Sequence, residues 1–388
     1  MTFQNTFLRR LPAFIVIALL AAACAIGYLH RNLLVWAFFQ VRFPGKAVAR
    51  QGLLASDLGG GVRVLASGLD APWAIGFLPD DSVLVTERRG ALKRIGQDGV
   101  VHDVTGLEGT KAVGEGGLLG LAIHPRFSEN RWIYLYQTAQ APDGLQNRVM
   151  RYRLKDDALS EATTVVQGIP ASSEHDGGAL AFGPDGRLYI GTGDAGNAPS
   201  AQDLGSLAGK ILRVNDDGSV PSGNPFGTPV WSYGHRNVQG LARDSLNRLW
   251  ATEHGRSGLL RTGLDELNLI EAGANYGWPV IEGDETADGL RTAAVHSGSS
   301  EPWAPAGSAV AGGNLFFGGL RGEALYQAKI GATPIPVLAN FEGEFGRIRA
   351  VAAGPDGKLY FTTSNTDGRG LPRPDDDRLI RIEAARFQ

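Results

Sequence analysis

One phrase recurs along the chain from about residue 62, and it constrains the fold more than any other feature. The phrase is an apolar run, a turn rich in Pro, Asp and Gly, and a second run rich in β-forming residues. Clear copies are AIGFLPDDSVLVTER (74–88), GLAIHPRFSENRWIYLY (120–136), ALAFGPDGRLYIGTGD (179–194), GLARDSLNRLWATEHG (240–255) and AVAAGPDGKLYFTTSN (350–365). A degenerate copy, GGNLFFGGLRG (312–322), fills the long gap between the last two. A repeated hairpin of this kind predicts an all-β fold.

The spacing of the six copies predicts a six-bladed β-propeller. A period of roughly 50 residues suits a four-stranded antiparallel blade. GALKRI, GKILRV and DRLIRI supply further strands with alternating apolar positions. We expect VRVLASGL near residue 62 and the carboxyl-terminal DRLIRIEAARF to complete one blade together, because a closed ring removes exposed sheet edges. A pair of packed β-sandwiches is the competing architecture. The predicted propeller domain spans residues 51–388.

The amino-terminal segment predicts a membrane anchor. LPAFIVIALLAAACAIGYL (11–29) has no charged residue, follows Arg9 and Arg10, and is long enough to cross a bilayer. Residues 1–50 are therefore expected to form a transmembrane signal anchor and a linker. Cleavage of the segment and lipidation at Cys24 are the alternatives. The basic residues that follow the segment do not favour a cytoplasmic amino terminus.

Composition excludes some functions. The chain has 54 Gly and only 20 Pro, as expected for many turns between short strands. Its net charge of −3, without a stripe of basic residues among aromatic ones, argues against nucleic acid as a partner. A single Cys excludes an internal disulfide framework and a metal site built from several cysteines.

Polar residues just outside the repeated hairpins are the candidate site. In a propeller the loops between strands converge on one mouth of the central channel, so distant residues can meet there. Four places stand out: His175 with Asp194, YGHRNVQG (233–240), EHG (253–255) followed by DELN (265–268), and GRIR (346–349). Each has an ordinary structural interpretation when taken alone. Together they bring a base, several cations and oxygen ligands, as a site for a polyanionic ligand would.

The chain resembles the soluble-type glucose/sorbosone dehydrogenase family from about residue 62 to 385. These are six-bladed propellers that oxidise sugars with pyrroloquinoline quinone (PQQ). The resemblance rests on the order of GEGGLLGLAIHP, HDGGALAFGPDGRLYIGTGD, GKILRVNDDGSVPSGNPF, YGHRNVQG, EHG, DELNLIEAGANYGWP, RIRAVAAGPDGKLY and TSNTDGRG. It implies oxidation of the anomeric hydroxyl of an aldose to a lactone, by hydride transfer to the quinone.

The resemblance also assigns site residues. His175 matches the catalytic base, Asp194 the carboxylate that orients it, and Arg236 the cation beside the quinone. The positions expected to contact the cofactor are Glu115, His175, Arg236, Asn237, Arg321, Arg347 and Arg349. Glu115 departs from the Gln of several relatives, and a carboxylate there repels PQQ unless it is protonated or paired.

The family also uses calcium, whose ligands are oxygen atoms. The resemblance places the metal near Gly255 and Arg256 through backbone carbonyls, with Glu253 and Asp265 as possible side-chain contributors. Residues 255–266 form a longer stretch than the family's compact version, and Arg256 stands where Pro is common. These departures leave the calcium geometry open.

By resemblance, electrons pass to a quinone or another carrier, and the propeller lies outside the cytoplasm, held at the inner membrane by its anchor or secreted if the anchor is cleaved. Two alternatives stay open: a calcium-dependent propeller hydrolase such as a lactonase, and a non-catalytic propeller that binds a partner. The loops expected to grip the sugar match no recognisable pattern, so no particular sugar follows.

Overall fold

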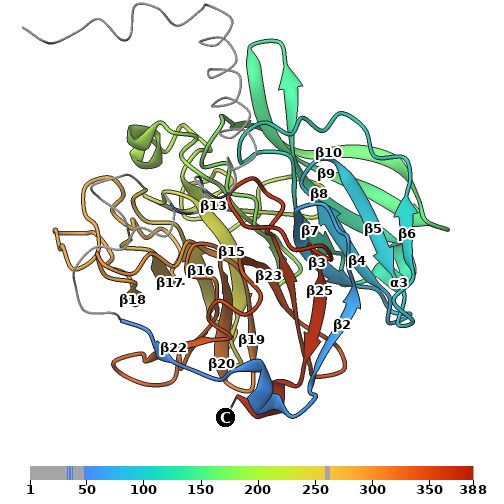
Figure 1. The fold of residues 1–388 in the computed structure, drawn as a ribbon. Coiled ribbons are helices and arrows are strands. Elements are labelled where there is room, and N and C mark those ends of the chain that lie inside the picture. Colours follow the sequence, from blue (N-terminus) through green and yellow to red (C-terminus); the bar gives the residue numbers. More distant parts are fainter. Residues whose placement is uncertain (1–32, 34, 36, 38–47, 258–262, 388) are drawn as a thin grey trace, which may run out of the picture.

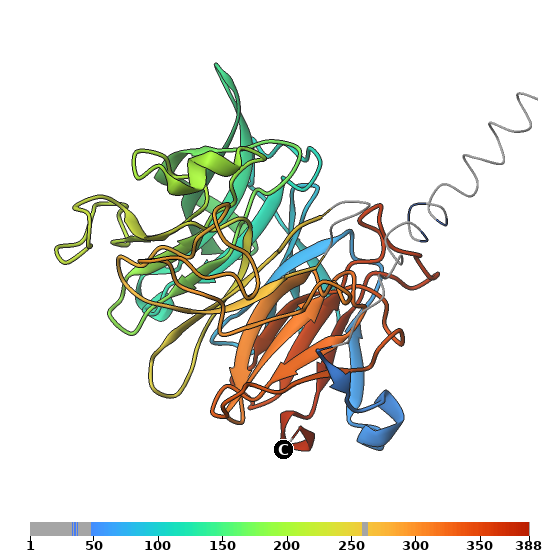
Figure 2. The ribbon, with the colours of Figure 1, turned by 90° about the vertical axis from the view of Figure 1, so that its left-hand side faces the viewer.

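The computed structural model describes residues 33, 35, 37, 48–257 and 263–387. Their strands form six sheets, each with four antiparallel strands, arranged around a central axis as seen from two sides in Figures 1 and 2. The predicted all-β, six-bladed propeller is therefore confirmed. The boundary between the two predicted regions at residue 50 stays a prediction.

Blades one to three follow the chain in order. Blade one contains β3 (Pro72–Phe77), β4 (Val83–Glu87), β5 (Ala91–Ile95) and β6 (Val101–Val104). Blade two contains β7 (Leu118–Ile123), the helical turn α3 (Phe127–Asn130), β8 (Trp132–Ala141), β9 (Gly144–Lys155) and β10 (Ala158–Pro170). Blade three contains β11 (Leu180–Phe182), β12 (Leu188–Gly191), the 3-10 turn η3 (Ala198–Gln202), β13 (Lys210–Val214) and β14 (Val230–Tyr233).

Blades four to six complete the ring. Blade four contains β15 (Val238–Arg243), β16 (Leu249–Glu253), β17 (Glu266–Ile270) and β18 (Val295–His296). Blade five contains β19 (Pro305–Ala311), β20 (Asn314–Gly319), β21 (Leu325–Ala328) and β22 (Val337–Asn340), to which β1 (Arg50–Gln51) adds a parallel edge strand. Blade six contains β23 (Ile348–Ala353), β24 (Leu359–Thr363), β25 (Leu379–Ile382) and β2 (Val62–Ala66). Two short 3-10 turns, η2 (Ala55–Leu58) and η4 (Ala384–Arg386), flank blade six.

The two ends of the propeller domain close the ring within one blade. Strand β2 pairs antiparallel with β25, with Val64 opposite Ile380, and the two strands lie side by side in Figure 1. The first and last strands thereby protect each other's hydrogen-bonding edges. This is the closure that the sequence predicted.

The second strand of each blade is buried on both faces. In β4, Leu84 belongs to the apolar cluster between blades one and two, whereas Val83 and Val85 belong to the cluster between blades six and one. In β12, Tyr189 and its neighbour Ile190 divide in the same way between two blade interfaces. Because successive strand side chains point to opposite faces, one strand fills two interfaces. This burial explains why these strands are apolar at nearly every position.

The first strands of the blades line the axis. A hollow of about 330 Å³ is bordered by residues of β3, β7, β11, β15, β19 and β23. Small residues such as Gly120, Gly240 and Gly307 lie along it. A Cβ at Gly120 would lie 1.9 Å from the carbonyl oxygen of Gly178, so the close approach of neighbouring first strands requires glycine there.

The predicted membrane localisation is corrected. In the described part of the chain, no helix is long and apolar enough to cross a bilayer. The segment 11–29, with Cys24, lies outside the described residues. The membrane-anchored placement of the propeller therefore takes no part in the function proposed below.

Ring closure makes a prediction about stability. Ile380 is fully buried, whereas its cross-strand partner Val64 is 48% exposed. We expect Ile380→Ala to lower the free energy of unfolding by about 2–5 kcal/mol, since it leaves a cavity at the closing blade. Val64→Ala is the matched control and should cost about 1 kcal/mol or less. Equal losses in chemical denaturation would contradict closure by this strand pair.

Candidate active site

The predicted site residues gather at one end of the propeller. Most of them lie just before the first strand of a blade or just after its second strand, whereas Arg349 lies within β23, Glu253 ends β16 and Asp265 precedes β17. His175 precedes β11 and Asp194 follows β12; Arg236 precedes β15 and His254 follows β16. Glu115 and Arg347 take the first of these positions in blades two and six. Because first and second strands run antiparallel, all these positions fall at the same end.

His175 and Asp194 form a buried pair. His175 Nδ1 lies 2.7 Å from Asp194 Oδ1, and the two residues are 8% and 1% exposed. Asp194 Oδ1 also accepts from the Gly196 amide at 2.8 Å, and Oδ2 accepts from the Trp278 indole at 2.8 Å. Burial alone would raise the pKa of Asp194, but these hydrogen bonds, that from His175 first, lower it below its ordinary value. Asp194 is thus an ionised acceptor that leaves the His175 Nε2 atom available.

The glycines beside the pair have a steric role. His175 adopts a left-handed backbone conformation, with φ of 57°. A Cβ on Gly193 would lie 1.7 Å from the His175 carbonyl oxygen. That oxygen accepts from the Ala195 amide at 3.2 Å, while the His175 amide donates to Glu115 Oε2 at 3.0 Å. The glycine permits the close contact that holds this strained histidine in place.

Arg236 is buried beside the pair. Its guanidinium donates to the His254 carbonyl at 3.3 Å and to Ser257 Oγ at 3.1 Å, and its Cζ lies 5.3 Å from the ring centroid of Trp278. Burial lowers the pKa of Arg236, whereas the charges of nearby carboxylates, above all Asp194, raise it. The effect of burial is larger, but an arginine still stays charged at neutral pH. In the described chain, its Nε atom is buried without a hydrogen-bond partner.

Glu115 is paired. Its Oε1 lies 2.8 Å from the Arg369 guanidinium. Burial would raise the pKa of Glu115, but Arg369 and then His254 lower it to about 2. The sequence raised the concern that this carboxylate repels an anionic ligand unless it is protonated or paired, and the structure provides the pair.

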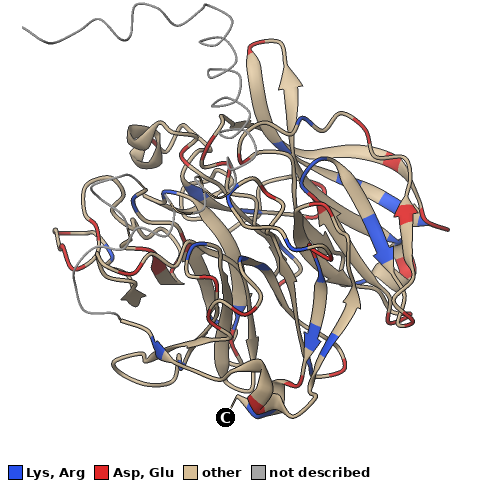
Figure 3. Ribbon diagram, in the orientation of Figure 1, with Lys and Arg blue, Asp and Glu red and all other residues tan. Residues whose placement is uncertain are grey.

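Arg347 and Arg349 share one carboxylate. Asp367 Oδ2 lies 2.8 Å from Arg347 Nη2 and 3.5 Å from Arg349 Nη2. Arg88 donates to the Asp367 backbone carbonyl at 3.1 Å. Basic and acidic residues are mixed over the whole ribbon (Figure 3), but here guanidinium groups outnumber carboxylates. This end of the channel therefore keeps a positive charge for an anionic ligand.

The residues predicted to bind metal have other partners. Asp265 accepts from the amides of Gly255, Trp303 and Ala304, at 2.9, 2.7 and 2.9 Å. Glu253 accepts from His235 Nδ1 at 2.9 Å and from the Arg236 amide. Among the residues that the structure describes, no group of three or more His, Cys, Asp or Glu side chains is placed to hold a metal ion. Both carboxylates accept hydrogen bonds from backbone amides, and their place near a metal stays a prediction.

A cavity of about 280 Å³ lies among these groups. Its walls include Glu115, His175, Arg236, His254, Gly255, Arg256, Asp265, Arg321, Arg347 and Arg369. It therefore joins most of the predicted positions; Asp194, Asn237, Glu253 and Arg349 are not among its lining residues. The Arg256 guanidinium pairs with Glu282. Burial lowers the pKa of His254 to about 3, so this imidazole is neutral at neutral pH.

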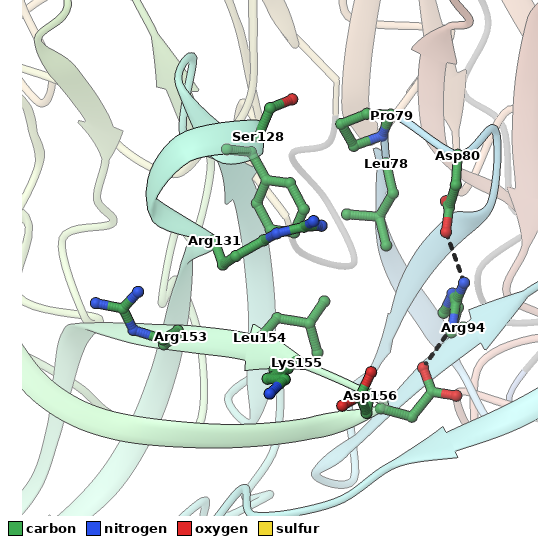
Figure 4. Close-up of a pocket in the computed structure, with 12 residues that line it drawn as sticks. Leu78, Pro79, Asp80, Arg94, Ser128, Arg131, Arg153, Leu154, Lys155 and Asp156 are labelled. Carbon is green, nitrogen blue, oxygen red and sulfur yellow. Dashed lines mark hydrogen bonds and ion pairs between the residues drawn. The ribbon is translucent and has the colours of Figure 1, made fainter.

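A larger hollow, of about 510 Å³, lies elsewhere (Figure 4). It is bordered by the β3–β4, β7–β8 and β9–β10 connections, at the opposite ends of the strands. Arg94 closes one side by pairing with Asp80 at 2.6 Å and Asp157 at 3.0 Å. It contains no histidine and none of the predicted site residues, so the smaller cavity is the candidate active site.

Sequence reasoning missed four contributors: Arg88, Arg369, His254 and Trp278. The last three lie inside phrases that carried the resemblance, TSNTDGRG, EHG and NYGWP, and Arg88 ends the first repeated phrase. His254 and Arg369 follow repeated hairpins in the sequence, and this position could have marked them as site residues. No such signal marked Trp278, which lies between β17 and β18.

The Glu115–Arg369 pair makes a prediction about pH. The pKa of Glu115 is lowered to about 2 from its ordinary 4.5, so its stabilising contribution is complete above about pH 5 and is lost as the pH falls toward 2. We expect Glu115→Gln to lower the melting temperature at pH 7 and to differ progressively less from wild type as the pH falls through this window. Glu108→Gln controls for the loss of one surface charge. A pH-independent difference between Glu115→Gln and wild type would contradict the pairing.

Comparison with known proteins identifies the family. The sequence model of the Glucose / Sorbosone dehydrogenase family matches residues 69–373. Aldose sugar dehydrogenase YliI of Escherichia coli is 34% identical over 345 residues, which cover 80% of this chain and 91% of the relative. The PQQ-bound aldose sugar dehydrogenase of Streptomyces coelicolor superposes with a TM-score of 0.77 at 41% identity, covering 83% of this chain and 97% of that one. The apo-form of the soluble E. coli aldose sugar dehydrogenase gives 0.75 at 31% identity, covering 83% and 99%. The chain therefore belongs to the glucose/sorbosone dehydrogenase family and is an oxidoreductase of the sugar dehydrogenase class.

Proposed function

We propose that this enzyme oxidises an aldose at its anomeric hydroxyl to the lactone, with PQQ as its cofactor. The observation that carries the proposal is the buried His175–Asp194 pair, whose histidine lines the same cavity as Arg236. A base oriented by a carboxylate and a nearby fixed cation are what oxidation of an alcohol to a carbonyl requires. The PQQ-bound relative supports the choice of cofactor.

Unsatisfied polar atoms fit a polar ligand at this place. Arg236 Nε, Asn237 Nδ2 and His254 Nε2 are buried in the described chain without a hydrogen-bond partner. A buried donor or acceptor left unpaired costs about 1–3 kcal/mol. The oxygens and nitrogens of PQQ offer partners for such atoms.

The charges also fit a tricarboxylate. Arg88, Arg347, Arg349 and Arg369 lie near Asp367 and Glu115 at this end of the channel, and Glu174 lies near Arg369. Planar guanidinium groups bind carboxylates bidentately, so Arg347 and Arg349 are proposed to hold the cofactor's carboxylates. Asn237 and Arg321 are proposed as further contacts.

When bound, PQQ supplies a two-electron acceptor for the hydride that leaves the anomeric carbon. His175 Nε2 takes the proton of the anomeric hydroxyl, because Asp194 holds Nδ1 as a donor and so leaves the other ring nitrogen as the acceptor. Asp194 then stabilises the imidazolium. Arg236 provides a fixed positive charge near the oxygens of the cofactor.

Calcium is proposed to bind at the wall of the cavity, at the backbone carbonyls of Gly255 and Arg256. Glu253 and Asp265 are proposed as side-chain contributors, because the hydrogen bonds that their oxygens accept orient the carboxylates without excluding a cation. A metal there would supply a Lewis acid beside the cofactor.

The alternatives fit less well. A calcium-dependent hydrolase needs several side-chain oxygens on the metal, and the described residues present no such group. A propeller that only binds a partner has no need of a buried histidine–aspartate pair within a ligand-sized cavity.

One experiment separates these functions. The purified full chain, free of cofactor, is incubated with PQQ and calcium and assayed on a series of aldoses with an artificial electron acceptor. We expect PQQ to bind and at least one aldose to be oxidised. Absence of both PQQ binding and turnover would leave the non-catalytic alternative. The natural electron acceptor, a quinone or another carrier, is a separate question.

His175→Ala tests the base. We expect PQQ affinity to stay within about threefold of wild type and kcat to fall about 10²- to 10⁴-fold, because the general base is lost while the arginines remain. His102, exposed on the outer strand of blade one, provides the control variant His102→Ala. Turnover by His175→Ala at the wild-type rate would remove the assignment.

Chelation tests the metal. Removal of calcium by a chelator should lower kcat of the PQQ-loaded enzyme at least about tenfold, and added calcium should restore it. Magnesium, which demands stricter octahedral geometry, should restore less. Unchanged turnover after exhaustive chelation would exclude a catalytic calcium.

A further inference from the structure

Trp278 contacts both halves of the proposed catalytic machinery. Its indole Nε1 donates to Asp194 Oδ2 at 2.8 Å, and its ring lies 5.3 Å from the Arg236 Cζ atom. It belongs to the segment between β17 and β18, in blade four, whereas Asp194 belongs to blade three. One side chain therefore connects the carboxylate of the base to the guanidinium across a blade boundary.

The backbone of Trp278 is held firmly. Its amide donates to the Gly234 carbonyl at 3.0 Å, and its carbonyl accepts from Gln202 Nε2 at 2.6 Å. Gln202 also exchanges hydrogen bonds with Asn275, of 3.0 and 2.7 Å. These bonds hold the backbone of Trp278 where its indole reaches both partners.

Asp194 depends on this contact for its orientation. His175 and the Gly196 amide both bond to Oδ1, at 2.7 and 2.8 Å. The indole is the side-chain donor at Oδ2. Without it, the carboxylate can turn about its bond to Cβ and carry Oδ1 away from the imidazole. A misoriented acceptor no longer selects the ring tautomer that the base requires.

Arg236 depends on the same ring. Within the described residues no carboxylate forms an ion pair with its guanidinium, which bonds to the His254 carbonyl and to Ser257 Oγ. The face of Trp278 supplies an attractive surface for this cation. A salt bridge to a carboxylate would neutralise the positive charge of Arg236. Contacts with a ring and with neutral oxygens leave that charge available to a ligand.

We propose that Trp278 is a positioning residue, whose indole N–H orients the His175–Asp194 pair and whose ring aligns Arg236 with that pair. The proposal rests on the function proposed above for its role in turnover. The part of the proposal that concerns the orientation of the His175–Asp194 pair involves hydrogen bonds within the protein only. It can be measured without cofactor.

Two variants separate the donor from the ring. Trp278→Phe removes the N–H and keeps an aromatic face, whereas Trp278→Ala removes both. Trp231→Phe is the matched control, because the Trp231 ring lies 4.9 Å from Arg213 outside the site. Melting temperature and near-ultraviolet circular dichroism report whether each variant folds.

In the apoprotein, the proton between His175 Nδ1 and Asp194 gives a downfield proton NMR signal, assigned by its absence in His175→Ala. We expect the signal to be lost or broadened in Trp278→Phe and unchanged in Trp231→Phe. With PQQ and calcium bound, Trp278→Phe should lower kcat at least about tenfold and change KM and PQQ affinity less than about threefold. Trp278→Ala should in addition weaken PQQ binding about fivefold relative to Trp278→Phe.

A folded Trp278→Phe that keeps the downfield signal and a kcat within twofold of wild type would overturn the proposal. Equal PQQ affinities of the Phe and Ala variants would overturn the part that concerns Arg236. If wild type fails to bind PQQ and to oxidise any aldose, the proposed function fails; the apoprotein signal still decides whether Trp278 orients the pair.

Discussion

The packing of each blade's second strand between two neighbours is the constraint on which the rest of the structure depends. Leu84 and Val85 in β4, like Tyr189 and Ile190 in β12, fill opposite interfaces from adjacent positions. Such a strand leaves apolar surface exposed unless a blade lies on both sides. The ring must therefore close, and in closing it brings the ends of six hairpins to one mouth.

Much of this architecture could be predicted from the sequence. The repeated hairpins located the first and second strands, because double burial makes them apolar and the turns between them need Gly, Pro and Asp. The short edge strands β1 and β18 could not be predicted, because they have two residues each and no periodicity. The parallel pairing of β1 with β22 is set by tertiary packing, which local pattern does not encode.

Site residues that flank the repeated hairpins could be predicted from the sequence. Contacts that depend on the path of a loop could not. His175, Asp194 and Arg236 meet as the resemblance implied. The role of Glu115 was uncertain because its partner, Arg369, lies 254 positions away. Glu253 and Asp265 were expected near a metal from the resemblance around Gly255, a prediction that stays open. Their bonds to backbone amides of the loops make them anchors, a role that depends on the path of the chain.

The same loops leave the site polar and incompletely satisfied, and this has an energetic consequence. Among the described residues, Arg236 Nε, Asn237 Nδ2 and His254 Nε2 are buried and have no protein hydrogen-bond partner. Burial of each unpaired atom costs about 1–3 kcal/mol, and this cost arises when the protein folds, before a ligand binds. A ligand that supplies partners recovers it on binding, and its own groups meet donors that are already oriented. Since an unsatisfied site lowers the stability of the apoprotein, binding of the matching ligand should stabilise the fold by the ordinary linkage of binding to unfolding. The closed ring of apolar interfaces supplies the stability that permits such a site.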